Sequence, residues 1–219
     1  MSFIRTNDNL PIPEVFASHA GSTILSPVVK RPVQGVGRGG QPLDMPGYVG
    51  TYTVRDGQPV PLGVVSDSYQ VVQMRDLCSA AESIMRGAFT PEQLSKIEIR
   101  DTSAGHGAWV RRQYVVKAFE EALEYGNATA RTIDVGTSVA ATCSITTSFD
   151  GGSSTQLDIG TLDLVCNNGM TALNAVDFFR RRHTKAATVE VFEDWLTDLG
   201  PRFSEQVETM KVWSDTALT

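Results

Sequence analysis

The densest group of side chains that could do chemistry in this sequence is a basic run at residues 180–185. It holds three consecutive arginines, a histidine and a lysine, which puts four fixed positive charges within six residues. The run precedes an amphipathic segment, so we expect it at the entrance of a helix, where outward-pointing backbone N–H groups also favour phosphate. The alternative is a solvated cluster that pairs with Glu190, Glu193 and Asp194.

A second positive group consists of Arg111, Arg112 and Lys117, on a segment predicted to be a strand. Because side chains alternate along a strand, Arg111 and Arg112 face opposite sides of the sheet, and Tyr114 shares the side of Arg112. An arginine or tyrosine stacked on an unpaired base would suit single-stranded nucleic acid. A cross-strand ion pair explains the same residues equally well, so both interpretations stay open.

The three histidines give little support to covalent catalysis. A nucleophilic Ser, Cys or Thr needs a positioned base, and the candidates are His19, His106 and His183. His19 falls in a loose N-terminal stretch and His106 stands between two glycines that predict a turn. Neither is accompanied by a Gly-x-Ser-x-Gly elbow. We therefore expect a protein that binds a partner and is not an enzyme.

Metal-dependent and nucleotide chemistry are also weakly supported. Asp158 and Asp163 are five residues apart on a predicted strand, which sends them to opposite faces. Convergence of Asp134, Asp150 and Asp163 in space would allow a nuclease, and we rank this reading last. The glycines of residues 35–40 have the wrong order for a phosphate-binding loop and are flanked by prolines. We predict an ordinary loop there, with no metal and no cofactor.

Length and composition limit the classes of protein to which this chain can belong. The chain has 219 residues, 41% hydrophobic and 20% charged, which suffices for one main domain. A formal net charge of −6 argues against a generally basic coat for nucleic acid. Cys78, Cys143 and Cys166 have no metal-binding spacing and indicate buried thiols in a reducing compartment. No stretch approaches the roughly 20 apolar residues of a membrane span. We therefore expect a soluble cytoplasmic protein.

The elements that position these groups follow a stretch rich in proline and glycine. Residues 1–47 hold six prolines and a glycine run, which cannot sustain a helix or an interior strand, so we predict an extended N-terminal arm. Residues 48–219 form the main domain. It opens with a hairpin whose turn is Asp56-Gly57. Apolar residues spaced by three and four from Met74 onward predict a helix that ends at Gly87.

Four segments rich in β-branched and aromatic residues predict a meander of antiparallel strands. They cover residues 97–100, 108–119, 138–149 and 156–166, with a hairpin loop at residues 150–154.

Helical spacing returns after this meander. A short helix is predicted through Met170, Leu173 and Val176, and a longer one over residues 189–199. A third is expected to begin at Gly200-Pro201 and to carry Phe203, Val207 and Met210. Strands and helices that are segregated in this way indicate an α+β fold with helices on one face of an antiparallel meander.

Two stretches resemble a family of phage/plasmid-like proteins catalogued as a domain of unknown function. The first is LGVVSDSYQVVQ at residues 62–73. The second is LVCNNGMTAL at residues 164–173, followed by Arg182-His183-Thr184. In that family a VVS-x-x-Y segment, a VC-x-N segment and an RHT segment recur in this order. The resemblance covers about residues 60–215 of the chain.

The arrangement in that family is similar to the core of the single-strand annealing recombinases, the superfamily that includes the Red-beta, Erf and eukaryotic annealing proteins. The resemblance implies a ring or filament of subunits that holds one DNA strand in a basic groove between the meander and the helices that follow. It also implies a set of phosphate contacts, namely Arg180, Arg181, Arg182, His183 and Lys185, helped by Arg111, Arg112 and Lys117.

We therefore expect a homo-oligomer of phage or mobile-element origin that binds single-stranded DNA and promotes annealing without ATP. A phage exonuclease or a host single-strand binding protein is its expected further partner. The alternative is a structural or protein-binding phage component with no nucleic-acid role, in which the N-terminal arm embraces a neighbouring subunit.

Overall fold

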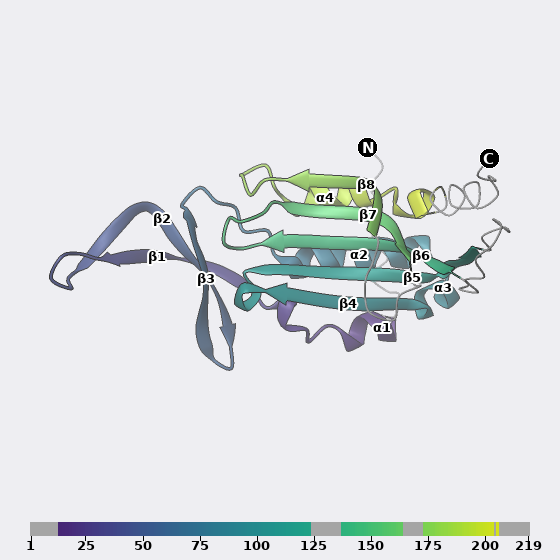
Figure 1. Ribbon diagram of the computed structural model, residues 1–219, viewed down its shortest axis with the longest axis horizontal. Coiled ribbons are helices and arrows are strands. Elements are labelled where there is room, and N and C mark those ends of the chain that lie inside the picture. Colours follow the sequence, from purple (N-terminus) through teal and green to yellow (C-terminus); the bar gives the residue numbers. More distant parts are fainter. Residues whose placement is uncertain (1–12, 124–136, 164–172, 204, 206–219) are drawn as a thin grey trace, which may run out of the picture.

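A computed structural model describes residues 13–123, 137–163, 173–203 and 205. These residues form two antiparallel sheets, with helices on one face of the larger sheet (Figure 1). The predicted α+β class is confirmed.

The larger sheet forms the body of the molecule. Its five strands lie in the order β4-β5-β6-β7-β8, and each is antiparallel to its neighbours. The strands are β4 (Ile97–Ala104), β5 (Trp109–Leu123), β6 (Thr137–Ser148), β7 (Thr155–Asp163) and β8 (Leu173–Arg181). The predicted four-strand meander corresponds to β4 through β7, and the predicted hairpin loop joins β6 to β7.

Strand β8 corrects the prediction of a short helix through Met170, Leu173 and Val176. From Leu173 onward the chain pairs with β7 in antiparallel register, while Met170 lies outside the described residues. Three apolar residues cover too few turns to hold a helix in isolation. The free edge of β7 offers backbone hydrogen bonds instead, and these outweigh the local spacing.

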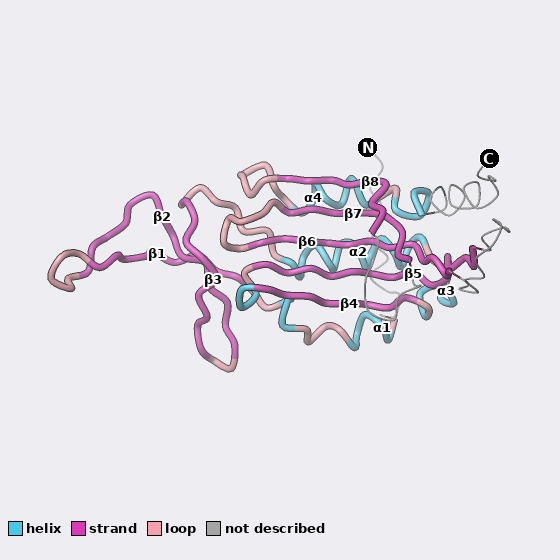
Figure 2. The backbone as a smooth tube through the Cα atoms, viewed as in Figure 1, coloured by secondary structure: helices cyan, strands magenta, loops and turns pink. Residues whose placement is uncertain are grey.

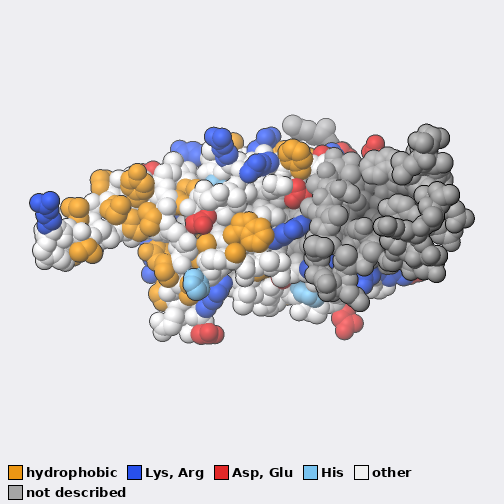
Figure 3. Space-filling model, in the orientation of Figure 1, with side chains coloured by type: hydrophobic (Ala, Val, Ile, Leu, Met, Phe, Trp, Pro, Cys, Tyr) orange, Lys and Arg blue, Asp and Glu red, His pale blue; other side chains and the backbone are white. Residues whose placement is uncertain are grey.

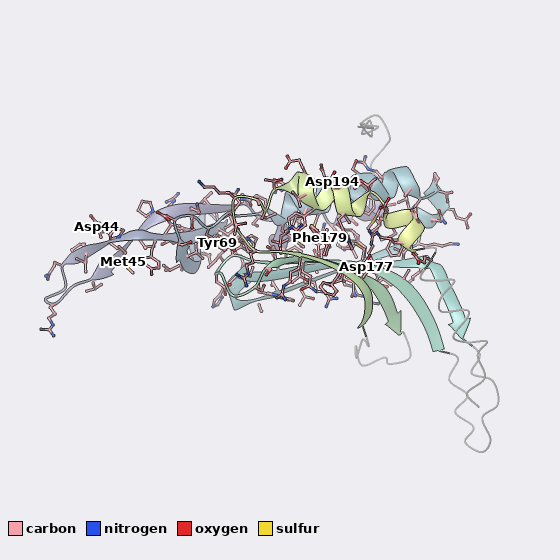
Figure 4. All side chains as sticks on the ribbon, turned by 90° about the horizontal axis from the view of Figure 1, so that it is seen from above. Asp44, Met45, Tyr69, Asp177, Phe179 and Asp194 are labelled. Atoms are coloured by element: carbon pink, nitrogen blue, oxygen red, sulfur yellow. The ribbon has the colours of Figure 1, made fainter. Side chains whose placement is uncertain are left out.

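Helices α2 (Met74–Ala88) and α4 (Val189–Leu196) cover one face of this sheet, as the view from above shows (Figure 4). The helix predicted from Met74 is confirmed and continues one residue beyond Gly87. Their buried side chains join those of the sheet in one core, to which α2 contributes Leu77 and Met85 and α4 contributes Phe192. Two short helices complete the layer, α1 (Glu14–Ser18) and α3 (Pro91–Ser95), with single 3-10 turns η1 (Thr23–Leu25) and η2 (Gly105–Gly107).

The end of α4 differs in detail from the prediction. The helix stops at Leu196, and residues 199–203 are helical again after a turn. Gly200 and Pro201 therefore lie in the first turn of the next helical segment and do not separate the two. Proline is tolerated there because first-turn N–H groups have no partner within the helix. Val207 and Met210 lie outside the described residues.

The smaller sheet has the order β1-β2-β3 and projects from one end of the body (Figures 1 and 2). Its strands are β1 (Val28–Val36), β2 (Pro42–Arg55) and β3 (Gln58–Ser66). We call residues 28–66 the arm sheet. The predicted hairpin is confirmed, since Asp56 and Gly57 join β2 to β3 with φ of 50° and 74°.

The arm sheet corrects the expectation that residues 1–47 hold only extended chain. Residues 28–36 pair with β2, and β2 itself runs across the boundary expected at residue 47. Prolines are tolerated because of where they fall. Pro32 lies in edge strand β1, while Pro42 and Pro46 lie in the part of β2 beyond its pairing with β3.

Contacts at the base of the arm sheet join it to the body. The Thr51 hydroxyl donates to the carbonyl of Phe149 at 2.6 Å, and the Tyr69 hydroxyl donates to the carbonyl of Ser148 at 2.7 Å. Gly63 lies against the loop between β6 and β7 so closely that a Cβ there would be 2.6 Å from the Cα of Asp150. The arm sheet is therefore packed directly on the β6–β7 loop.

Candidate nucleic-acid interface

The face of the five-stranded sheet away from α2 and α4 carries the candidate site. On β5, Val110, Tyr114 and Val116 join the core beneath the helices. Alternation sends Trp109 and Arg111 to the opposite side. We use the term open face for six accessible residues of β5 to β8 on that side, namely Trp109, Arg111, Thr146, Gln156, Phe178 and Arg180. Figure 3 views the molecule from this side and shows Lys and Arg side chains close to hydrophobic ones.

Strand register brings these residues together from four strands. Arg111 pairs with Thr146, Thr146 with Gln156, and Gln156 with Arg180. These four side chains therefore form one row across the sheet. At the usual strand spacing, the Cα atoms of Arg111 and Arg180 are roughly 14 Å apart. The row is polar throughout, with Arg111 and Arg180 separated by Thr146 and Gln156, and exposed Thr102 of β4 continues it beyond Arg111.

Two aromatic rings accompany this row. Phe178 lies two residues from Arg180 on the same face, and its side chain is 64% exposed. Trp109 lies two residues from Arg111 and is partly exposed. Large exposed aromatic side chains are unusual in the middle of a strand and mark surfaces that bind something.

Two adjoining depressions lie on either side of the β6–β7 loop and share Ser153 and Ser154. The first, of about 320 Å³, lies on the open face and is lined by Trp109, Arg111, Thr146, Gln156 and Asp158. The second, of about 310 Å³, is lined by Tyr69, Gly151, Gly152, Arg180, Arg182, His183 and Thr184. Both are shallow, which suits an extended ligand better than an enclosed small molecule.

The arginines around these depressions keep free hydrogen-bond donors. The Nη2 group of Arg111 donates to the Ser144 hydroxyl at 3.0 Å, and its buried Nε has no partner among the described residues. Arg180, Arg182 and Lys185 are exposed, and within the described part of the chain they make no ion pair. The alternative, in which the basic run pairs with Glu190, Glu193 and Asp194, is therefore not seen among the described residues.

The basic run is divided between the two faces of the sheet. Arg180 lies on the open face, whereas Arg181 lies over the ring of Phe179, with its Cζ 4.5 Å from the ring centroid. Phe179 in turn contacts Phe192 and Trp195 on the helix side. The predicted position at a helix entrance is wrong, because β8 ends at Arg181 and α4 begins only at Val189.

Arg112 is a buried structural residue. Its side chain is 1% exposed, and its guanidinium donates to Asp101 at 2.9 Å and to Glu82 at 3.2 Å. Burial alone would lower the pKa of Arg112, but the hydrogen bonds to Asp101 keep that pKa raised. The same group also donates to the carbonyl of His19. The expected phosphate contact does not fit this geometry, and Arg112 is left out of the proposed interface.

His183 is likewise buried, with 8% of its surface exposed. Its ring stacks on Tyr69 with centroids 4.5 Å apart, and its Nδ1–H donates to the carbonyl of Gln70 at 2.9 Å. Burial lowers the pKa of His183, so the ring is neutral near pH 7. Its contacts with Tyr69 and Gln70 anchor the loop after β8, and a buried neutral ring is a poor phosphate contact.

Lys117 lies near the middle of β5, further along the strand than Trp109 and Arg111. Eight residues of strand separate it from Trp109, which corresponds to about 27 Å. Its ammonium pairs with Glu98 at 2.9 Å. Hydrogen bonds from Arg100 and then Lys117 lower the pKa of Glu98 to about 2, so the carboxylate stays charged. This lysine is not brought together with Arg111 and Arg180.

Sequence reasoning missed Trp109, Phe178 and Gln156 as site residues. The signal was present in the alternation Phe178-x-Arg180, which places a ring and a guanidinium on one face of a strand. It was obscured because the preceding residues were assigned to a helix.

The arrangement of the described side chains does not support the catalytic alternatives. Among the residues that the structure describes, no three His, Cys, Asp or Glu side chains group to hold a metal. Asp158 is buried and accepts a hydrogen bond from Gln156, while Asp134 lies outside the described residues, as does the side chain of Asp163. Burial raises the pKa of the Cys78 thiol to about 12 and also raises that of Cys143. These two cysteines are buried and free, as predicted, and Cys166 lies outside the described residues.

The fold and this face define an α+β protein with an accessible sheet surface that carries aromatic and arginine side chains. Residues 61–219 match the family described as Domain of unknown function (DUF932). The match covers more than half of the chain, and the protein belongs to this family. No curated protein and no solved structure matches it. The described helices include none that is long and apolar enough to cross a membrane.

Proposed function

We propose that the protein binds single-stranded DNA on the open face and promotes annealing, as an ATP-independent homo-oligomer of phage or mobile-element origin. One observation supports this above all others. Trp109, Arg111, Phe178 and Arg180 lie on one accessible sheet face, with Thr146 and Gln156 between the two arginines. Two rings for bases and two guanidiniums for phosphates match the chemistry of an unpaired strand.

Stacking favours a single strand over a duplex as the ligand. An unpaired base can lie flat on an aromatic ring and gains about 1–3 kcal/mol without regard to its identity. A stacked base keeps its Watson–Crick edge free, so a complementary strand can still pair with it. Annealing then needs no covalent step and no nucleotide cofactor.

The charge of the chain limits the size of the binding face. With a net charge of −6, most of the surface repels a polyanion, so attraction depends on a few arginines near the β6–β7 loop. Arg182 and Lys185 are exposed beside the second depression and would extend the phosphate path beyond Arg180. In the host cytoplasm, a phage exonuclease or a host single-strand binding protein would supply or occupy the same strand.

Binding is tested by the fluorescence anisotropy of a labelled oligothymidine at about 50 mM and about 200 mM salt. We expect binding at low salt that weakens as salt rises. Trp109→Ala/Phe178→Ala should lower the affinity at least tenfold at both salt concentrations. Arg111→Ala/Arg180→Ala should lower the affinity and also reduce its salt dependence. The matched control is Arg75→Ala, which removes an exposed arginine from α2 on the other side of the sheet.

Annealing is tested separately, with two complementary labelled strands and no ATP. The protein should accelerate duplex formation, and the aromatic double variant should not. Absence of oligonucleotide binding at low salt would reject the proposal, and binding without acceleration would reject annealing.

A second candidate is a structural or protein-binding component with no nucleic-acid role. It is favoured by the arm sheet, which carries seven of the eight exposed large hydrophobic side chains of the described residues. It predicts assembly without DNA together with no affinity for the oligonucleotide at either salt concentration.

A further inference from the structure

The arm sheet exposes apolar side chains that none of the described helices or strands covers. Within the described residues, the large hydrophobic side chains exposed on it are Val29, Val36, Leu43, Met45, Tyr48, Val54 and Val64. The remaining one is Phe178 on the open face. A monomer rarely leaves such a concentration uncovered, because burying it against a partner is favourable.

These side chains form two patches. Near the tip, Leu43 pairs with Gly35, and the side chain of Met45 lies 3.5 Å from the position of a Cβ on Gly35. At the base, Val29 pairs with Tyr52 on β2, and Val64 pairs with Gly50 from the other side. The ring of Tyr52 lies over Gly50, where an added Cβ would be 2.5 Å away. Tyr52 and Val64 are therefore neighbours on one face.

The charge of the arm sheet is opposite to that of the rest of the chain. Four cationic and two acidic side chains give residues 28–66 a net charge of +2, so the remaining residues carry −8 within the chain total of −6. Lys30 donates to backbone carbonyls of Asp67 and Tyr69, whereas Arg31 and Arg38 are exposed. Within the described residues neither exposed arginine makes an ion pair.

Helix α4 offers the complementary surface. Its outer face carries Glu190, Glu193 and Asp194, all exposed and, among described residues, without an ion pair. Their spacing of three and four residues aligns them on one side of the helix. Half-buried Val191 and Trp195 flank this acidic stripe and add apolar surface beside it.

We propose that the tip of the arm sheet docks on the acidic outer face of α4 of a second copy of this chain. The arm sheet points away from its own body, so its tip does not reach its own α4 (Figures 1 and 4). Each copy carries one tip and one acidic stripe, and such a head-to-tail contact builds a closed ring or a filament. The inference rests on the homo-oligomer of the proposed function and is independent of its DNA binding.

The test is the solution mass of the full chain, measured by sedimentation equilibrium without DNA. We expect an oligomer. Leu43→Ser/Met45→Ser, Arg38→Glu in the turn at the tip, and Glu190→Lys/Glu193→Lys/Asp194→Lys should each shift the mass to that of the monomer while circular dichroism stays unchanged, whereas Arg31 lies opposite Gly50 at the base and is left unchanged. Combining the two charge reversals in one chain should restore the oligomer, because opposite charges face each other again. Arg75→Glu, an exposed reversal on α2, should leave the mass unchanged.

A monomeric wild type, arm variants that stay oligomeric, or a combined reversal that fails to reassemble would each overturn the inference. The outcome is separable from that of the proposed function. A monomer that binds the oligonucleotide rejects docking and leaves DNA binding standing. An oligomer that binds no oligonucleotide does the reverse.

Discussion

The two sheets of this protein differ in how far their apolar side chains are buried. The body sheet buries residues such as Ile145 and Ile159 under helices and turns threonine, glutamine and arginine outward. None of the described helices lies over the arm sheet, and residues such as Leu43 and Val64 are exposed. An antiparallel sheet can pack its apolar face on the core and expose its polar face to water, whereas exposed apolar strands indicate a surface that binds a partner. The body sheet therefore supports the fold and the open face, and we propose that the arm sheet serves assembly.

The largest expected effect is a loss of stability when a buried residue of the body sheet is replaced. Arg112→Ala leaves the partly buried carboxylates of Asp101 and Glu82 without their buried cation, and we expect a loss of about 3–5 kcal/mol in the free energy of unfolding. Urea denaturation measures it. Arg75→Ala should change stability by less than about 0.5 kcal/mol. An Arg112→Ala protein as stable as the wild type would mean that the buried ion pairs do not tie α2, β4 and β5 together.

The next effect concerns the junction of the two sheets. Gly63→Ala places a methyl group within contact of the backbone of Asp150 and must push β3 away from the β6–β7 loop. We expect a loss of about 1–3 kcal/mol in stability, together with weaker oligonucleotide binding, because the same loop lines both depressions. Gly21→Ala, where a Cβ meets no atom within 4 Å, is the control and should retain both properties. Unchanged stability in Gly63→Ala would show that close packing of β3 on the β6–β7 loop does not stabilise the protein.

A smaller effect is expected from pH. Burial lowers the pKa of His183 below its usual 6.5, so the unfolded state takes up a proton that the folded state does not. The stability due to neutral His183 is fully present above pH 6.5 and is lost as the pH falls through that value toward the folded pKa. Stability measured from pH 7.5 to pH 5 should fall more in the wild type than in His183→Gln.

The comparison with His183→Gln is needed because Glu82 acts in the opposite direction. Burial raises the pKa of Glu82, so its contribution to stability grows as the pH falls. That contribution is common to both proteins and cancels in the difference. Identical pH profiles would contradict the buried, neutral state of His183.

The smallest effect on stability is expected at the tip of the arm sheet. Leu43→Ser/Met45→Ser removes exposed side chains, so the free energy of unfolding of the separated subunit should change by less than about 0.5 kcal/mol. Chemical denaturation at low protein concentration measures it. A loss of several kcal/mol would show that these side chains support the fold and would blur the distinction between the two sheets.

Features set by local sequence could be predicted. Asp56-Gly57 takes positive φ values and fixes a hairpin within four residues, and the spacing of apolar residues from Met74 defines α2. Strands β4 through β7 follow from long alternating segments. Strand β8 could not be predicted in this way. Residues 173–176 form a strand because they pair with β7, and the spacing of their own apolar side chains does not reveal that pairing.

The site was predicted only in part for a related reason. Arg111 and Arg180 reach the open face, whereas the equally basic Arg112 and Arg181 point to the helix side, where Glu82 and Asp101 or the ring of Phe179 receive them. Charge alone does not tell these arginines apart. Arg112 is buried by carboxylates on other elements, which its own sequence neighbourhood does not reveal, whereas Arg181 stays exposed but lies on the helix side.

The central claim is that bases stack on the open face, and tryptophan fluorescence tests it most directly. Trp109 lies on that face, while Trp195 packs against Phe179 on the helix side. We expect an oligothymidine to quench the fluorescence of the wild type at low salt, and we expect Trp109→Phe to lose most of that quenching while it still binds. Equal quenching in Trp109→Phe, or no quenching and no binding in the wild type, would contradict the account.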